Sequence, residues 1–420
     1  MKLKYLKKLI VLLFISILIL FSNSCVFANT ESPELVSQAA ILLDYKTGKV
    51  LYEKNSTEKM YPASTTKIMT AILTLENCSL DEVVTVSYDT VMSIPQGYSS
   101  ANLQIGEQLT VAQLLQLLLV PSANDAANCL AEHVGGSVES FVSMMNTKLN
   151  ELGITNTHFT NAFGMDNDEH YTTAQDLAAI MKYCMENETF RKLAGSASCA
   201  IPATNKYGPR KYVSTNELII PNNSNYYSYL TSGKTGYTSQ AGDCLVSCAY
   251  KDDLELICVV LGGKTVNGVS TRFSETKALY DFAYSNYSMQ NVLTQNDIVT
   301  QIKIKRGTKD TKNLDLLAKN SVLVLLENNV STDNFDFEIK LNEKIKAPIV
   351  EGDVLGSVTY KVDNIEYSTD LIASHNVDKS RLLEILIEIG IGILILFLVY
   401  KIFFHRKKEK YRYINYKGRY

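Results

Sequence analysis

Tyr61-Pro62-Ala63-Ser64-Thr65-Thr66-Lys67 is the part of this sequence that says most about its fold and chemistry. Pro62 precedes a helical run to about Glu76, so Ser64 lies beside the first backbone N–H groups and the positive end of the helix dipole. Lys67 follows one turn later on the same face. A neutral lysine can accept a serine proton, and burial or a second cation lowers a lysine pKa. The stretch therefore predicts a serine nucleophile with a lysine base.

A second motif, Ser122-Ala123-Asn124, supplies a hydroxyl and an amide. It follows an apolar helix that is predicted over residues 111–120 and ended by Pro121, so we expect it in a loop. The Ser122 hydroxyl can relay a proton to a leaving amine. The Asn124 side chain can bond a substrate amide.

A third motif, Lys234-Thr235-Gly236, lies in a strand predicted over residues 230–237. Lys234 is the natural candidate for the second cation beside Lys67, and it can also pair with a substrate carboxylate. Thr235 adds a hydroxyl, and Gly236 leaves room for a substrate backbone along the strand. The three motifs together predict acyl transfer on a substrate that ends in a carboxylate.

Each motif has a second copy, and order and context separate the copies. Lys46-Thr47-Gly48 is expected to be a hairpin turn between strands over residues 39–43 and 49–52. Ser274-Glu275-Thr276-Lys277 is expected on a solvated helix face together with Arg272 and Asp281. Ser214-Thr215-Asn216 repeats the second motif. Only the set headed by Ser64 has the right order and suitable surroundings.

The element pattern predicts an antiparallel sheet built from the first and last parts of residues 29–290, with a helical cluster between them. Helices are expected over residues 64–76, 111–120, 126–133, 138–152, 173–185 and 272–284, and strands over residues 230–237, 244–250 and 254–261. Residues 291–376 are expected to form a small all-β domain, with strands over residues 298–304, 321–326, 335–341, 354–362 and 367–372.

The two ends of the chain predict export and anchoring. Residues 1–28 have the basic, apolar and small-residue regions of a secretory signal peptide; a lipoprotein reading through Cys25 is the weaker alternative. Residues 382–404 are long and apolar enough to span a membrane, because about 20 residues suffice. The basic segment 405–420 then lies in the cytoplasm. An amphipathic helix in the interface is the alternative, but residues 389–400 have no polar face.

Composition sets further limits. The chain has 420 residues and a formal net charge of -3, and its one dense basic cluster is the C-terminal tail, so nothing indicates nucleic-acid binding. Eight cysteines are present, and loss of Cys25 with the signal leaves an odd number. Cys244 and Cys248 fall in one predicted strand, about 13 Å apart, too far for a disulfide. Most of the cysteines are therefore interpreted as small core residues.

The three motifs in this order are typical of penicillin-recognising serine enzymes, and the chain resembles the D-alanyl-D-alanine carboxypeptidases, the low-molecular-mass penicillin-binding proteins. The resemblance covers about residues 37–372. Beyond the motifs it rests on these features: Tyr61-Pro62-Ala63, Asn124-Asp125-Ala126-Ala127, Thr160-Asn161, Gly164, His170, Thr173-Ala174, Asp176-Leu177, Ala347-Pro348-Ile349, Gly352 and Gly356.

The resemblance implies an α/β (α+β) catalytic domain of the β-lactamase/transpeptidase type, followed by the β domain and the membrane helix. It implies removal of the last D-alanine from peptidoglycan stem peptides through an acyl-enzyme on Ser64, and covalent inhibition by β-lactam antibiotics. It also implies an oxyanion hole from the N–H groups of Ser64 and Tyr237. No cofactor or metal is expected, and the expected location is the outer face of the bacterial cell membrane.

Three alternatives remain. A β-lactamase shares the motifs, but residues 166–169 lack the local pattern of the glutamate that class A enzymes use. A zinc peptidase using Asp166, Asp168, Glu169 and His170 has no H-E-x-x-H motif to support it. A non-catalytic penicillin sensor or wall-binding protein would be expected to lack a motif residue, and none is missing. A histidine-dependent serine triad has no supporting context.

Overall fold

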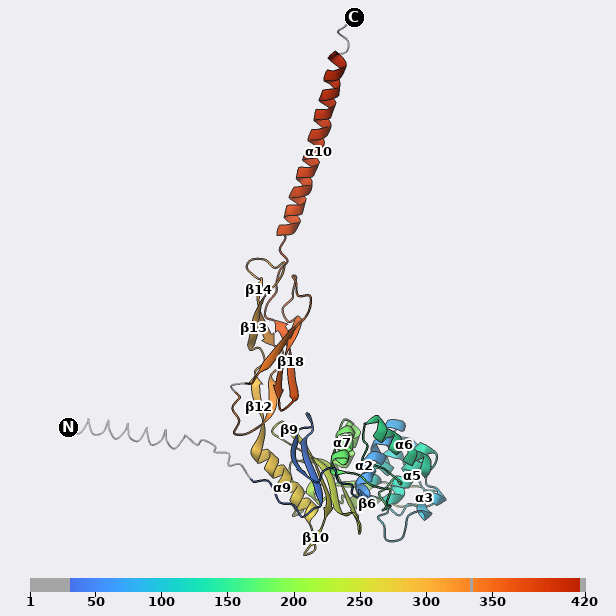
Figure 1. Cartoon of the computed structure of the whole chain (residues 1–420). Helices are drawn as coiled ribbons and strands as arrows, with labels where there is room; N and C mark the ends of the chain where they lie inside the picture. The colour runs from blue at the N-terminus through green and yellow to red at the C-terminus, as the bar shows by residue number, and fades with distance from the viewer. Residues whose placement is uncertain (1–30, 333–334, 416–420) are drawn as a thin grey trace, which may run out of the picture. The chain divides into compact units, whose positions relative to one another are not determined.

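The computed structural model describes residues 31–332 and 335–415, which divide into two units (Figure 1). The first unit runs to Met289 and includes Leu325–Val330, and the second contains Gln290–Val324 and the chain from Ser331 onward. The predicted signal peptide and residues 416–420 lie outside the described residues, as do the side chains of residues 404–415.

A five-stranded sheet forms the centre of the first unit. Its strand order is β2-β1-β9-β8-β7, and each neighbouring pair is antiparallel. The predicted hairpin and the three predicted strands are all present. The strands are β1 (Ala39–Asp44), β2 (Val50–Lys54), β7 (Leu230–Thr238), β8 (Gly242–Lys251) and β9 (Leu254–Gly263). The third motif therefore lies on an edge strand, β7.

The sheet is buried on both faces, which explains why its strands are nearly continuous apolar runs. Ile41 and Val259 belong to one core cluster, whereas their chain neighbours Leu42 and Val260 belong to the other. The first cluster is completed by the helical part of the chain. The second is completed by α9 (Thr271–Asn286), which lies on the opposite side of the strands in Figure 1.

The helical cluster follows the predicted pattern, and two short helices, α3 and α8, add to it. Side-chain caps fix several starts; Thr110, for example, forms a capping box with Gln113. The helices are η1 (Ala63–Thr66), α2 (Lys67–Asn77), α3 (Tyr88–Met92), α4 (Val111–Leu119), α5 (Asn124–Gly135), α6 (Val138–Glu151), α7 (Ala174–Cys184), α8 (Glu188–Ala194) and η2 (Glu217–Ile219). Short strand pairs were not predicted: β3 (Val83–Thr85) with β4 (Gln108–Thr110), β5 (Ser198–Ile201) with β6 (Arg210–Val213), and β10 (Thr265–Val266) with β11 (Val269–Ser270).

The expected solvated face of α9 is wrong for three residues, Arg272, Glu275 and Thr276, and Thr276 is fully buried. The Glu275 carboxylate is buried and accepts hydrogen bonds from the N–H groups of Val36 and Ser37 and from the Ser37 hydroxyl. The Arg272 side chain is only 15% exposed. Ser274 is exposed, as expected of a second S-x-x-K copy without a catalytic role. The seven cysteines of the described residues are free and five are buried, which confirms the interpretation of most of them as core residues; Cys78 and Cys199 are partly exposed.

The second unit contains the predicted all-β domain. Its antiparallel sheet has the order β13-β14-β18-β17-β16. Strands β12 and β14 were not predicted. The strands of this sheet are β13 (Ile298–Lys303), β14 (Asn313–Ala318), β16 (Phe337–Leu341), β17 (Val354–Val362) and β18 (Ile365–Ala373). Strand β12 (Tyr287–Leu293) pairs with β15 (Val322–Glu327), and each of the two has residues in both units.

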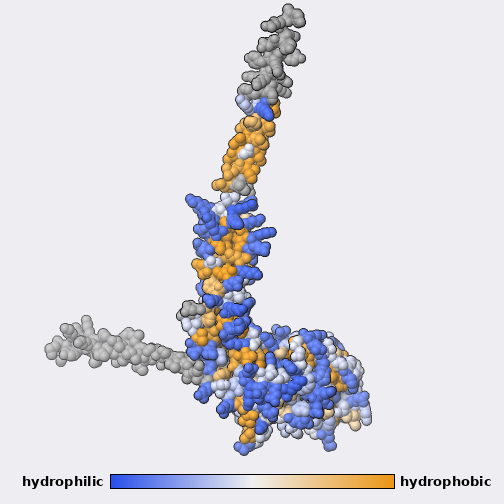
Figure 2. Space-filling model, in the orientation of Figure 1, coloured by the Kyte–Doolittle hydropathy of each residue, from blue (hydrophilic) through white to orange (hydrophobic). Residues whose placement is uncertain are grey.

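The last element is a long helix, α10 (Leu382–Asn415). Its segment Ile385–Phe403 has 19 residues with a mean hydropathy of 2.5, and is long and apolar enough to cross a membrane. Figure 2 shows this segment as a band of apolar surface. None of the segment is buried within the described part of the chain.

Candidate active site

The predicted nucleophile lies in a tight turn that two glycines make possible. Ser64 belongs to η1, directly after Ala63, which has a φ of +48°. A Cβ atom on Gly164 would lie 1.7 Å from the Ala63 carbonyl oxygen, and one on Gly236 would lie 3.0 Å from the Ser64 nitrogen. Only glycine therefore lets the segment around Gly164 approach this turn, and Gly236 brings strand β7 against it.

Lys67 has contacts that suit a general base. Its Nζ lies 2.8 Å from Ser64 Oγ, 2.6 Å from Asn124 Oδ1 and 2.8 Å from the Phe163 carbonyl oxygen. The last two atoms can only accept, so a neutral amine donates its two hydrogens to them. The lone pair then faces the Ser64 hydroxyl. Burial, and then the charge of Lys234, hold the pKa of Lys67 well below its usual range.

The second motif places its hydroxyl at the same cleft through an unusual backbone. Ser122 has a φ of +64°, a left-handed conformation that costs a non-glycine residue about 1–2 kcal/mol. The bonds of its neighbours hold it there: Ala123 N–H donates to Leu117 O, and Asn124 N–H donates to Ser99 O, both at 2.9 Å. Asn124 begins α5, and its side chain bonds Lys67.

The third motif supplies a buried cation. Lys234 is 1% exposed, and its Nζ donates to the Thr235 carbonyl oxygen at 2.9 Å. Burial, and then the charge of Arg272, lower the pKa of Lys234 to about 7. Thr235 Oγ1 lies 2.5 Å from Thr215 Oγ1. An anion that enters the cleft would meet a cation and two hydroxyls.

Sequence reasoning missed three residues of this site. Arg272 Nη1 donates to the Gly236 carbonyl oxygen at 2.7 Å and lies 3.5 Å from Asp243 Oδ1. Thr215 belongs to the second S-x-N copy, so its position was visible in the sequence but its contact with Thr235 was not. Phe163 contributes only a backbone oxygen, for which a sequence gives no signal.

A cleft of about 440 Å³ brings the predicted residues together. Ser64, Ser122, Asn124, Thr235, Gly236 and Tyr237 line it, together with Tyr98, Asp166, Thr215 and Arg272. Lys67 and Lys234 lie behind this lining, because each is almost fully buried and bonds a lining residue. Tyr237 is 63% exposed, so its side chain faces solvent.

The side chains of the acidic loop near His170 form hydrogen bonds to neighbouring residues. His170 is buried; its Nδ1 accepts from Thr160 N–H at 2.9 Å, and its Nε2 therefore donates to Thr66 Oγ1 at 2.9 Å. Asp166 accepts from the Thr238 hydroxyl, and Asp168 from the Tyr61 hydroxyl. Within the described ranges these side chains form no group that could hold an ion, so the zinc peptidase alternative has no support.

The fold and this site define a serine acyl-transfer enzyme of the penicillin-recognising class. The chain belongs to the D-alanyl-D-alanine carboxypeptidase family, whose profile matches residues 27–265. A second profile, that of the penicillin-binding protein 5 C-terminal domain, matches residues 287–379. The protein is therefore a serine-type D-alanyl-D-alanine carboxypeptidase, followed by the β domain of this family.

Known proteins resemble this chain over both the catalytic domain and the β domain. D-alanyl-D-alanine carboxypeptidase DacF of Bacillus subtilis is 34% identical over 368 residues, which cover 85% of this chain and 91% of the relative. The crystal structure of penicillin binding protein 5 from Haemophilus influenzae is 27% identical, has a TM-score of 0.63, and is matched over 83% of this chain and all of its own. The structure of PBP3 from Streptococcus pneumoniae, at 24% identity and a TM-score of 0.70 over 82% of this chain and all of its own, shares the fold.

Proposed function

We propose that the chain removes the terminal D-alanine from peptidoglycan stem pentapeptides, with Ser64 as nucleophile and Lys67 as base. The observation that carries this proposal is the contact set of Lys67, in which the neutral amine has one partner able to give it a proton, the Ser64 hydroxyl. The buried Lys234 complements it as the partner of the substrate carboxylate.

Acylation follows from these positions. Ser64 Oγ attacks the carbonyl carbon between the two D-alanines as its proton passes to Lys67 Nζ. The N–H groups of Ser64 and Tyr237 are proposed to hold the developing oxyanion. The C–N bond then breaks, and the proton reaches the leaving amine through the Ser122 hydroxyl. Free D-alanine departs and the shortened peptide stays as an ester on Ser64.

We propose that the edge strand β7 orients the substrate. The terminal carboxylate is proposed to bind Lys234 and Thr235, with Thr215 beside them. The Asn124 amide bonds the peptide amide, and Gly236 lets the peptide run along β7. Water enters after D-alanine leaves and hydrolyses the ester, with Lys67 again taking a proton.

We further infer that the enzyme works at the outer face of the cell membrane. The proposed organisation is a signal peptide over residues 1–28, a catalytic domain over 29–290, a β domain over 291–376, an anchor over 382–404 and a cytoplasmic tail over 405–420. The apolar segment Ile385–Phe403 and the basic residues after it support this topology.

Mass spectrometry of a stem pentapeptide before and after incubation tests the proposal. We expect the loss of one alanine with the wild-type chain and none with Ser64→Ala. Ser274→Ala is the matched control, because Ser274 heads the second S-x-x-K copy and lies exposed on α9. Alanine release by Ser64→Ala at the wild-type rate would remove Ser64 from the mechanism.

A further inference from the structure

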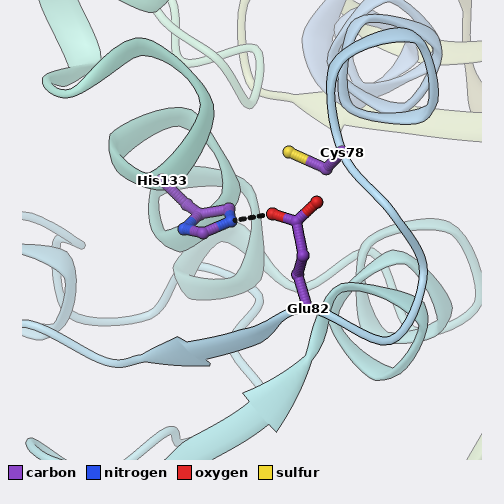
Figure 3. Close-up of side chains that lie close together, drawn as sticks. All are labelled: Cys78, Glu82 and His133. Atoms are coloured by element: carbon purple, nitrogen blue, oxygen red, sulfur yellow. Dashed lines mark hydrogen bonds and ion pairs between the residues drawn. The ribbon is translucent and has the colours of Figure 1, made fainter.

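Three potential metal ligands meet far from the cleft, at the ends of two helices. Cys78, Glu82 and His133 each offer one ligand atom, and these atoms lie within 4.8 Å of one another. Figure 3 shows the three side chains converging, with His133 Nε2 3.0 Å from Glu82 Oε2. We propose that this cluster is a structural zinc site, with one sulfur, one nitrogen and one oxygen ligand and water as the fourth.

The donor set selects the metal. Zn²⁺ takes thiolate, imidazole and carboxylate ligands at about 2.0–2.3 Å in a tetrahedral arrangement. Ligand atoms at those distances lie roughly 3.3–3.8 Å apart. A pair at the 4.8 Å limit must therefore close by about 1 Å, and His133 Nε2 and Glu82 Oε2, now 3.0 Å apart, must separate slightly to admit the ion. Mg²⁺ and Ca²⁺ prefer oxygen ligands, and a sulfur and an imidazole disfavour both. Binding releases the proton of the Cys78 thiol to solvent.

The ligands are held in place by their own backbones. Cys78 caps α2, and its N–H donates to Thr74 O at 3.0 Å. Glu82 O accepts from Val111 N–H at 2.9 Å, which fixes the segment before β3. Glu82 Oε1 accepts from Ser79 N–H at 2.5 Å and leaves Oε2 directed at His133. Such a bond to a ligating carboxylate orients it for the metal.

The position of the cluster defines what the ion would do. Helix α2 begins at Lys67 and is followed by Cys78, and α5 begins at Asn124 and carries His133 in its last turn. The two helices thus start at the active site, where Lys67 bonds Asn124 at 2.6 Å, and both end at the cluster. At 1.5 Å per residue, the eleven residues from Lys67 to Cys78 place the ion about 16 Å from Lys67. It would fasten the far ends of the helices and take no part in the chemistry.

Metal content of the full chain, purified in detergent and stripped of metal, tests the site. After equilibration with Zn²⁺ and removal of the excess, we expect one zinc per chain. Co²⁺ in place of Zn²⁺ should give the near-ultraviolet charge-transfer band of a cobalt–thiolate bond. Cys78→Ser and His133→Gln should lose the bound zinc, and Cys78→Ser should lose the cobalt–thiolate band. Cys199→Ser and His158→Gln are matched controls outside the cluster and should keep both.

Two further readouts separate a structural site from a catalytic one. Zinc at about 100 times its dissociation constant should raise the melting temperature of the wild-type chain by roughly 5–10 °C and that of Cys78→Ser by none. Penicillin labelling of Ser64 should continue at an unchanged rate in both cluster variants, which also shows that they fold. Less than stoichiometric zinc in the wild-type chain, or a cobalt–thiolate band that persists in Cys78→Ser, would overturn the proposal.

Discussion

Lys67 and Lys234 lie behind the lining of the same cleft and need opposite charge states. Lys67 must be neutral to take a proton, and burial with the nearby cation of Lys234 favours that form. Lys234 must be charged to bind a carboxylate, but burial and Arg272 lower its pKa to about 7. The substrate carboxylate restores the charge of Lys234 when it binds, because an opposite charge raises a lysine pKa.

The opposite charge states of Lys67 and Lys234 predict how kcat/KM depends on pH. The pH profile of kcat/KM reports pKa values of the free enzyme. The value should fall as pH drops through the lowered pKa of Lys67, because the base becomes protonated. It should also fall as pH rises above about 7, because free Lys234 loses its proton. Arg272→Gln should move the alkaline limb to higher pH, since the Arg272 charge lowers the Lys234 pKa.

Arg191→Gln is the control for that profile, because Arg191 pairs with Glu255 and does not line the cleft. Its alkaline limb should stay at the wild-type pH. If the alkaline limb falls at the same pH in the wild-type, Arg272→Gln and Arg191→Gln enzymes, the titration of Lys234 does not cause that limb.

Lys234→Ala tests carboxylate binding directly. A charge-assisted hydrogen bond contributes about 1.5–3 kcal/mol. We therefore expect kcat/KM for a peptide with a free C-terminal carboxylate to fall at least tenfold. The C-terminally amidated peptide should lose far less. The two peptides should be compared below pH 7, where Lys234 of the wild-type enzyme is protonated. Equal losses on the two peptides would exclude Lys234 as the carboxylate partner.

At the residue scale, the order of the three motifs and their surroundings in the sequence were enough to choose the motif residues that the structure brings together. Ser64 and Lys67 are one helical turn apart, so their contact follows from local geometry. Arg272 belongs to α9 and reaches the site by tertiary contacts, such as its bond to the carbonyl oxygen of Gly236 on β7. Such a contact depends on tertiary packing, and no spacing in the sequence encodes it.

At the scale of elements, Gly164 controls how two loops meet. Gly164→Ala would place a Cβ atom 1.7 Å from the Ala63 carbonyl oxygen and force the nucleophile turn to move. A displacement of about 1 Å at a reacting group costs about 10²-fold in rate. We expect a loss of that size in the rate of penicillin acylation, measured by stopped-flow or by timed gel labelling.

Gly153→Ala is the matched control for the backbone conformation. Gly153 also has a positive φ, +70°, but no atom lies within 4 Å of an added Cβ. This variant should lose about 1–2 kcal/mol of stability and keep its acylation rate. If Gly164→Ala acylates as fast as Gly153→Ala, the proposed fit of the loops is wrong.

Elements with a strong pattern of their own were predictable, and elements that depend on a partner were not. The helix over residues 111–119 and strands β8 and β9 have long apolar runs. Strands β5 and β6 are four residues each and exist because they pair with one another. The burial of Glu275 was missed for the same reason, because its partners lie about 240 residues away in the chain.

At the scale of the whole molecule, all proposed catalytic and substrate-binding residues lie in the first unit. A chain from Asn29 to Arg381 lacks the signal peptide and α10 but keeps the bond from Ser380 N–H to Arg306 O. It should be soluble and react with penicillin at the rate of the full chain, which should itself sediment with membranes. A shortened chain that stays with the membranes would contradict the proposed anchor, and one that folds but is not acylated would contradict the domain organisation.

The most direct measurement is the intact-protein mass of the enzyme over time, with penicillin and with a D-alanyl-D-alanine peptide. Peptide cleavage frees D-alanine, so water can reach the ester on Ser64. When penicillin acylates Ser64, its leaving amine stays covalently attached to the acyl group and cannot depart. The amine therefore continues to block water, and the penicillin adduct should persist in the cleft. We therefore predict one stoichiometric, long-lived penicillin adduct, absent in Ser64→Ala, and continuous peptide turnover. Rapid repeated penicillin hydrolysis without peptide turnover would contradict the account and indicate a β-lactamase.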